Sequence, residues 1–153
     1  MPSGEPGEFF TWTEMTRSAT ATKRGLSNNP DLQQRVNLKM LCSTVLDPLR
    51  RHLGRPVSVT SGFRSDAVNE AVGGSKSSAH RKGLAADIEV KGLDAHAVMQ
   101  AVLECDCEFD QAIAYAPSRG GHVHLGLATG RQRGQQLWAP ASGGYEPYNP
   151  FCD

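Results

Sequence analysis

The sequence predicts an α+β fold, in which helices pack on a small antiparallel sheet. A helical pattern of apolar residues opens at Pro30, and segments typical of short strands follow between residues 57 and 127. The elements come in the order helix, strand, helix, strand, helix, strand, strand. We expect a single domain over residues 1–153, with an irregular N-terminal arm at 1–29 and an irregular C-terminal tail at 130–153.

The composition excludes several classes of protein. The 153 residues carry 16 basic and 16 acidic side chains, so the formal net charge is zero, and 39% of them are hydrophobic. A neutral chain gains little from electrostatic attraction to nucleic acid or to a membrane surface, and no apolar run approaches the roughly 18 residues of a membrane span. We therefore expect a globular monomer that binds neither nucleic acid nor membrane.

The first long helix is predicted to begin after Pro30 and Asp31. Apolar residues then recur every three to five positions, Pro48 marks a kink or a break, and the helix stops near Gly54. The predicted apolar stripe of this helix consists of Leu32, Val36, Met40, Val45, Leu49 and Leu53.

Short strands and helices follow in the middle of the chain. Val57 and Val59 lie in the first predicted strand, and Asp66 is the expected cap of a helix that reaches Val72. A flexible loop rich in glycine and serine then occupies residues 73–78.

The next predicted strand, over residues 84–90, has one polar face. Asp87 and Glu89 share that face because side chains alternate along a strand. The remaining predicted elements are a helix at 93–104 and two strands at 111–116 and 122–127.

The four cysteines are Cys42, Cys105, Cys107 and Cys152. An even number permits two disulfides, but the start of the chain lacks the basic and apolar regions of a secretory signal, so we expect reduced thiols. Cys105 and Cys107 form a C-x-C pair, whereas structural zinc normally uses a wider spacing and a second cluster. We interpret the pair as ordinary half-buried thiols, with metal or redox chemistry as the alternative.

The histidines are the residues best suited to chemistry. His122 and His124 are two positions apart on a predicted strand, so both imidazoles face one side of it. His80 ends the glycine- and serine-rich loop, and Asp87 lies on the polar face of the next strand. Two histidines and one aspartate would make a three-ligand site with a fourth position for water, which is the arrangement of catalytic zinc. A solvated sheet face is the alternative.

The pattern S-x-H-x-x-G-x-A-x-D over residues 78–87, followed by the distal H-x-H, resembles the zinc D-Ala-D-Ala carboxypeptidases and related M15 peptidases, and most of all their short M15A-type group from bacteria and phages. The similarity extends over about residues 9–127. It includes Ser-Gly-Phe-Arg-Ser at 61–65, Val-Gly-Gly-Ser at 72–75 and Phe-Asp-Gln at 109–111. The resemblance implies a fold like that of the DD-peptidases and Hedgehog proteins.

The resemblance also implies roles for single residues. His80, Asp87 and His124 would hold one zinc ion. Arg64 falls where the family places an arginine near the substrate carbonyl, and there it would stabilise the developing oxyanion, although a surface salt bridge is its alternative role. Ser78 would hydrogen-bond the substrate or cap its own loop.

The sequence departs from the family at the general base. Many M15 members have an acidic residue three positions before the last zinc ligand, but here that position is Gly121. His122 is the nearest replacement, and an imidazole can accept a proton at neutral pH. Asp110 and Glu89 are further candidates. A catalytically degenerate module that binds zinc on the same fold is therefore the alternative to an enzyme.

The function implied by the resemblance is hydrolysis of a peptide bond in the stem peptide of bacterial peptidoglycan. The bond would be D-Ala-D-Ala or L-Ala-D-Glu, and the sequence does not choose between them. Without an export signal, we expect a protein made in the cytoplasm and carried to the cell wall by a phage, as an endolysin or as part of the virion.

Overall fold

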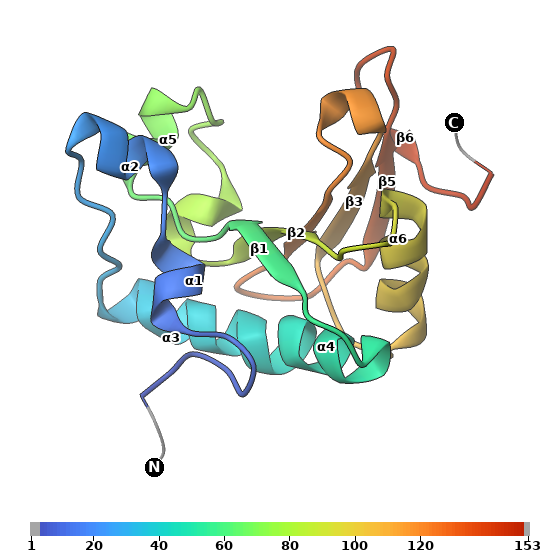
Figure 1. The fold of residues 1–153 in the computed structure, drawn as a ribbon, viewed down its shortest axis with the longest axis horizontal. Coiled ribbons are helices and arrows are strands. Elements are labelled where there is room, and N and C mark those ends of the chain that lie inside the picture. Colours follow the sequence, from blue (N-terminus) through green and yellow to red (C-terminus); the bar gives the residue numbers. More distant parts are fainter. Residues whose placement is uncertain (1–3, 152–153) are drawn as a thin grey trace.

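The computed structural model describes residues 4–151, in which helices flank a six-stranded sheet (Figure 1). The strands are β1 (Ser58–Ser61), β2 (Ala85–Glu89), β3 (Gln111–Tyr115), β4 (Val123–Gly126), β5 (Gln135–Ala139) and β6 (Glu146–Pro147). The α-helices are α1 (Trp12–Thr16), α2 (Ala19–Arg24), α3 (Leu32–Leu41), α4 (Asp47–Leu53), α5 (Asp66–Ala71) and α6 (Ala95–Glu104). Three short helical segments are the π-helix η1 (Cys42–Leu46) and the 3-10 helices η2 (Ala79–Lys82) and η3 (Pro117–Arg119). The α+β class is confirmed.

The strand order of the sheet is β1-β2-β4-β3-β5-β6. The pairs β1–β2, β2–β4, β3–β4 and β5–β6 are antiparallel, as predicted for the sheet. The pair β3–β5 is parallel, so the prediction of a purely antiparallel sheet is wrong at this one boundary. The parallel pair arises because β5 returns to the sheet after a connection over residues 127–134 instead of a tight hairpin.

The C-terminal segment was predicted as an irregular tail, and this prediction is wrong for β5 and β6. Trp138 lies in β5 and is only 1% exposed, so the strand is anchored by an aromatic side chain as well as by pairing with β3. The local sequence Gln-Gln-Leu-Trp-Ala gives little strand signal of its own, and it is the partner strand that determines its conformation. Residues 152 and 153 lie outside the described residues, and with them the Cys152 thiol.

The N-terminal arm was also predicted as irregular, but it contains α1 and α2. Thr11 caps α1 in a capping box with Glu14, and Ser18 caps α2 by accepting a hydrogen bond from the Ala21 backbone N–H. Each helix has no more than six residues, too few to show a helical period, so the caps are the only local signal for them.

The long helix does not break at Pro48. It continues from α3 through the π-helix η1 into α4, and the wider π-turn, in which the Asp47 N–H bonds to the Cys42 carbonyl, directly precedes Pro48 and accommodates its missing N–H. The Asp47 carboxylate accepts hydrogen bonds from the backbone N–H groups of Glu8 and Phe9, at 2.9 and 3.2 Å. The helix ends at Gly54, as predicted.

The predicted apolar stripe of the long helix is wrong in its first half. Leu32, Val36 and Met40 are 80%, 50% and 40% exposed, whereas Leu38 and Leu41 are fully buried. The π-helix adds a residue to its turn and so rotates the helix on either side of it. The buried face that contains Val45 and Leu49 therefore continues toward the N-terminus through Leu41 and Leu38.

The helix at residues 66–71 is capped one residue earlier than predicted. The Ser65 hydroxyl accepts a hydrogen bond from the Val68 backbone N–H at 3.2 Å, and Asp66 is the first residue of α5. The helix α6 begins after Asp94, two residues later than predicted, because the Asp94 side chain accepts a hydrogen bond from the Ala97 backbone N–H and caps the helix.

The two faces of the sheet have different roles. Figure 1 shows α3 and α4 below the sheet and α6 beside it, and buried side chains such as Ala86, Ile88 and Leu125 pack in the hydrophobic core. Asp87 and His124 alternate with these residues and point to the other face. Among the described residues, no helix is both long enough and apolar enough to cross a membrane.

Candidate metal centre

Three side chains that the sequence analysis selected as ligands lie together. His80 comes from η2, Asp87 from β2 and His124 from β4, and their ligand atoms all lie within 4.8 Å of one another. The Asp87 Oδ1 atom is 2.9 Å from His124 Nδ1 and 3.4 Å from His80 Nε2. Within residues 4–151, these three side chains make up the group that could hold a metal ion.

The β-sheet places two of the three ligands. Asp87 and His124 are direct partners in the antiparallel ladder between β2 and β4, so their side chains leave the sheet side by side on the same face. Ile113 of β3 is the next partner of His124 in the same row. The positions of these two ligands therefore depend on strand register, because a shift of one residue would turn one of the side chains to the opposite face.

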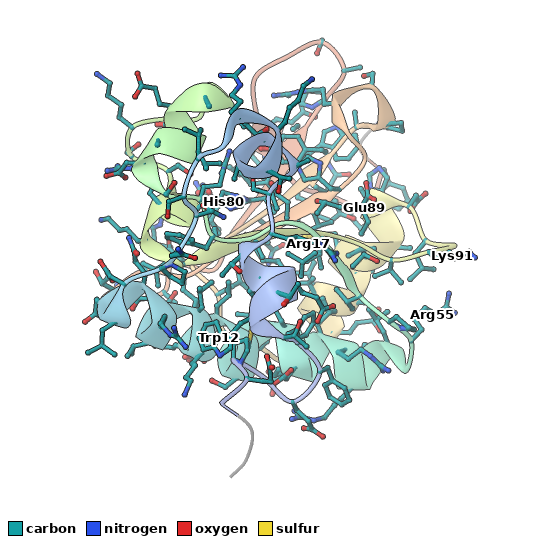
Figure 2. All side chains as sticks on the ribbon, turned by 60° about the vertical axis from the view of Figure 1, so that its left-hand side comes forward. Trp12, Arg17, Arg55, His80, Glu89 and Lys91 are labelled. Atoms are coloured by element: carbon teal, nitrogen blue, oxygen red, sulfur yellow. The ribbon has the colours of Figure 1, made fainter. Side chains whose placement is uncertain are left out.

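The third ligand, His80, is oriented by a hydrogen bond to the segment that follows β1. His80 is only 2% exposed, and Figure 2 shows it inside the molecule, whereas Arg55 and Lys91 project from the edge. The His80 Nδ1–H donates a hydrogen bond to the Gly62 carbonyl oxygen at 2.7 Å. This contact leaves Nε2 as the atom that faces Asp87, which is how metal-binding histidines are commonly oriented.

The donor set fits a metal cation. His80 Nε2 lies 3.4 Å from a carboxylate oxygen of Asp87, and a cation between these two atoms would be bound by both. Tetrahedral nitrogen and oxygen ligands at about 2 Å from zinc lie about 3.3 Å from one another, close to the spacings observed here. Two imidazoles and one carboxylate, without a thiolate, are typical ligands of catalytic zinc.

The Asp87 carboxylate stays ionised in this site. Burial acts to raise its pKa, but contacts with His124 and His80 and the field of both imidazoles together hold the pKa well below its usual range. A carboxylate that is already charged can bind a cation without first losing a proton, which favours metal binding at neutral pH.

The candidate site opens into a cleft of about 440 Å³. Arg64 and Ser78 line this cleft together with the three possible ligands, so the structure brings these predicted residues together. The lining is completed by Ser75, Ser77, Ala79, Asp110, Gln111, Ile113, Tyr115, Arg133 and Tyr145.

Arg64 is more buried than a surface arginine. Its Nε atom is buried and has no hydrogen-bond partner within residues 4–151. Arg64 also forms no salt bridge within those residues, so its alternative role in a surface salt bridge is not observed. Burial lowers the pKa of its guanidinium, while the charge of Asp87 acts in the opposite direction. The backbone N–H of Arg64 donates to the His80 carbonyl at 3.1 Å, so the arginine is fixed close to the metal group.

Ser78 caps its own loop. Its hydroxyl accepts a hydrogen bond from the His80 backbone N–H at 3.3 Å, at the start of η2. The capping role, one of the two possibilities given for Ser78, is therefore observed, and Ser78 also lines the cleft.

His122 lies beside the metal group and not within it. Its Nε2 atom is 4.0 Å from Asp87 Oδ1, and its side chain is 21% exposed. The ring stacks on Tyr115, with centroids 4.3 Å apart and planes 20° apart. Burial lowers the pKa of His122 below its ordinary value, against the opposing charge of Asp87, so the neutral ring is favoured.

The other candidates for a general base are placed less favourably. Gly121 has a φ of +65°, a left-handed conformation in which an acidic side chain would be strained. Asp110 lines the cleft, but Arg133 donates to it from Nε and Nη2 at 3.0 and 2.8 Å, and these hydrogen bonds lower the pKa of Asp110. Glu89 is exposed at the end of β2.

Sequence reasoning missed a group of aromatic and basic residues near His122. The Tyr115 and Tyr145 hydroxyls are 3.4 Å apart, and the guanidinium of Arg119 lies over both rings, at 5.5 and 5.2 Å from their centroids. Arg119 also donates to the backbone carbonyls of Pro140 and Gly144. The alternation of the strand at 111–115 could have placed Tyr115 opposite His122, whereas nothing in the local sequence placed Tyr145 beside it.

Comparison with known proteins agrees with this geometry. The sequence model of the Peptidase M15 family matches residues 8–126, which contain all three possible metal ligands, Arg64 and His122. No curated protein sequence gives a significant match. Because the match covers most of the chain, this protein belongs to the peptidase M15 family.

Proposed function

We propose that this protein is a zinc-dependent peptidase that hydrolyses a peptide bond in the stem peptide of bacterial peptidoglycan. The observation that carries the proposal is the group of His80, Asp87 and His124 on the wall of a cleft, in a chain that matches the M15 family. Three protein ligands leave one position of a tetrahedral zinc ion for water or substrate, as catalytic sites require.

A zinc ion at this site would polarise the scissile carbonyl and acidify the attacking water. Among the protein's own residues, Arg64 would stabilise the negative charge that develops on the carbonyl oxygen. Its guanidinium reaches the cleft with a buried Nε that has no partner within residues 4–151, so a developing negative charge would meet a donor that is already desolvated. We assign Arg64 to stabilisation of that charge.

His122 is the residue that we assign to proton transfer. Its Nε2 lies 4.0 Å from the carboxylate oxygen that both other histidines contact, so it is within reach of a water at the metal group. The imidazole would take a proton from the attacking water and return it to the leaving amine. Asp110 is already paired with Arg133 and is a weaker candidate for the same role.

Mass spectrometry of peptidoglycan fragments tests the activity and identifies the bond. Purified peptidoglycan treated with the zinc-loaded protein is expected to lose a terminal D-Ala if the D-Ala-D-Ala bond is cut, or stem peptides that begin with D-Glu if the L-Ala-D-Glu bond is cut. A chelator should stop the release and added zinc should restore it, and the His80→Ala variant serves as the matched control. Intact stem peptides after prolonged treatment with the zinc-loaded protein would reject the proposal.

A second candidate function is supported by Gly121. Because this position carries no side chain and has a left-handed backbone, the acidic base of many M15 relatives has no equivalent there. The chain would then be a zinc-containing module that binds cell-wall peptide without cutting it. Zinc-dependent sedimentation with peptidoglycan, without release of fragments, would favour this function over the peptidase.

A further inference from the structure

Two thiols lie in contact where α6 ends. The Sγ atoms of Cys105 and Cys107 are 3.3 Å apart, and both approach the Val102 carbonyl oxygen, at 3.4 and 3.7 Å. Both side chains are partly buried against the hydrophobic core and partly open to solvent. A small reagent can therefore reach sulfur atoms that are already side by side.

The backbone holds the two thiols together. Cys105 follows the last residue of α6, with its N–H bonded to the Ala101 carbonyl at 2.9 Å. Asp106 then adopts a φ of +59°, and it is the only residue other than glycine with a positive φ within residues 4–151. Aspartate tolerates this left-handed conformation better than most residues do. The turn directs the side chains on either side of Asp106 toward each other.

The two thiols differ in acidity. A hydrogen bond with Cys107 lowers the pKa of Cys105 to about 7, although burial acts in the opposite direction. The same contact and burial raise the pKa of Cys107. One thiolate can therefore form near neutral pH beside one protonated thiol, and a thiolate is the nucleophile in disulfide exchange.

We propose that Cys105 and Cys107 form a reversible dithiol–disulfide site that reacts with small-molecule disulfides such as oxidised glutathione. The sulfurs need to approach from 3.3 Å to a bond of about 2.04 Å, a movement that side-chain rotation over a short turn can provide. This inference does not depend on the peptidase activity.

The exchange takes place in two balanced steps. The Cys105 thiolate attacks one sulfur of glutathione disulfide, which forms a mixed disulfide and releases one glutathione thiolate. Cys107 then loses its proton to solvent and attacks the Cys105 sulfur, which forms the internal bond and releases the second glutathione. The protein loses two hydrogen atoms, and one glutathione disulfide becomes two glutathione thiols.

Cys42 provides an internal control in the same molecule. It is fully buried in the core, and burial, followed by the charge of Asp47, raises its pKa. A buried thiol in this state reacts slowly. Reaction at Cys105 and Cys107 but not at Cys42 would therefore reflect their local structure and not the total number of thiols.

The test uses the full chain with Cys152→Ser, folded and zinc-loaded, in buffers with a series of ratios of reduced to oxidised glutathione. After acid quenching and alkylation, tryptic peptide 92–119 contains Cys105 and Cys107, and peptide 40–50 contains Cys42. We expect peptide 92–119 to become two hydrogen atoms lighter and resistant to alkylation, while peptide 40–50 stays alkylated. Dithiothreitol should reverse the change.

Two single variants separate the roles of the thiols. Cys107→Ser is expected to stop at the mixed disulfide on Cys105, and Cys105→Ser to react more slowly with glutathione. The same titration in urea should need a larger share of oxidised glutathione, because the unfolded chain no longer holds the sulfurs in contact. The proposal is overturned if peptide 92–119 stays doubly alkylated at every ratio, carries two glutathiones without an internal bond, or oxidises equally well in urea.

Discussion

The imidazole of His80 is oriented by a backbone carbonyl. Its Nδ1–H is engaged by Gly62, and its burial leaves no solvent to compete for that proton. The ring therefore presents Nε2 toward Asp87, and rigid ligands lose less conformational entropy when they bind an ion. The motif at residues 78–87 was enough to predict this ligand, but its partner Gly62 became evident only in the structure.

The first prediction concerns the metal. The His80→Ala variant is expected to lose the bound zinc, because only two of the three ligands remain, while its far-ultraviolet circular dichroism stays like that of the wild type. Zinc per chain, measured by atomic emission, should fall from about one to near zero. His52→Ala is the matched control, since His52 lies on α4 close to Glu104 and outside the metal group. Unchanged zinc content in His80→Ala would contradict the site.

The second prediction concerns His122. Replacing it by alanine should keep the zinc, because its ring is not part of the ligand group. The rate of stem-peptide release should fall about 100-fold or more, as expected when a general base is removed. Initial rates and zinc content measured on the same preparations check both expectations. A wild-type rate in His122→Ala would show that another group, such as Asp110, takes the proton.

At the scale of elements, β-ladders bring distant residues into one site. The H-x-H pattern predicted the face of β4, and the alternation at 84–90 predicted the face of β2, so sequence reasoning supplied the right residues on the right faces. It did not supply the register that makes Asp87 and His124 direct partners. It also did not place Tyr145 beside Tyr115, because this contact depends on a long-range connection that no local pattern encodes.

A third prediction follows from the stacking of two cross-strand neighbours, Tyr115 and His122. Tyr115→Ala should reduce kcat by about 2- to 10-fold, the equivalent of losing one aromatic pair, while zinc content stays unchanged. Tyr115→Phe keeps the stacked ring and should retain most of the rate. Equal losses of kcat in both variants would show that the hydroxyl contact with Tyr145 matters and not the stacking.

The fourth prediction concerns the close approach of Gly62, the residue after β1, to α1. A Cβ added at Gly62 would lie 2.4 Å from the Met15 carbonyl oxygen, which also accepts a hydrogen bond from the Phe63 backbone N–H. Gly62→Ala should therefore lower the free energy of unfolding by about 1–3 kcal/mol. It should also weaken zinc binding, since the Gly62 carbonyl orients His80.

Urea unfolding of apo protein measures the stability change of Gly62→Ala, and a zinc titration measures the affinity. Gly130→Ala is the matched control, because no atom lies within 4 Å of an added Cβ at that position. An equal midpoint of unfolding for the two variants would contradict the steric argument.

For the whole molecule, the class and most elements were predictable, because period-two and helical patterns reflect which side chains face the core. The errors fall where long-range contacts or irregular turns decide the conformation. The π-helix at 42–46 shifted the apolar face of the long helix, and β5 formed because β3 offered a free edge. The single domain, the monomeric state and delivery to the wall by a phage stay predictions.

The fifth prediction concerns stability. A zinc ion bound only by the folded chain stabilises it by about 2.7 kcal/mol when free zinc is 100 times its dissociation constant. Chelation should therefore lower the Tm by about 5–10 °C for a domain of this size. Differential scanning calorimetry with and without chelator measures the change, and His80→Ala should show none. Identical Tm values for wild-type protein under both conditions would mean that the folded chain holds no zinc.

The position of the cleft wall in the chain has a consequence for how the site can vary. All three ligand residues precede residue 125, whereas Tyr145 and Arg133 of the cleft wall come later in the chain. The ligand set and this wall are therefore encoded by separate parts of the sequence. Substitutions after residue 126 can change the shape and charge of the cleft, and with them the choice of substrate, without replacing a ligand.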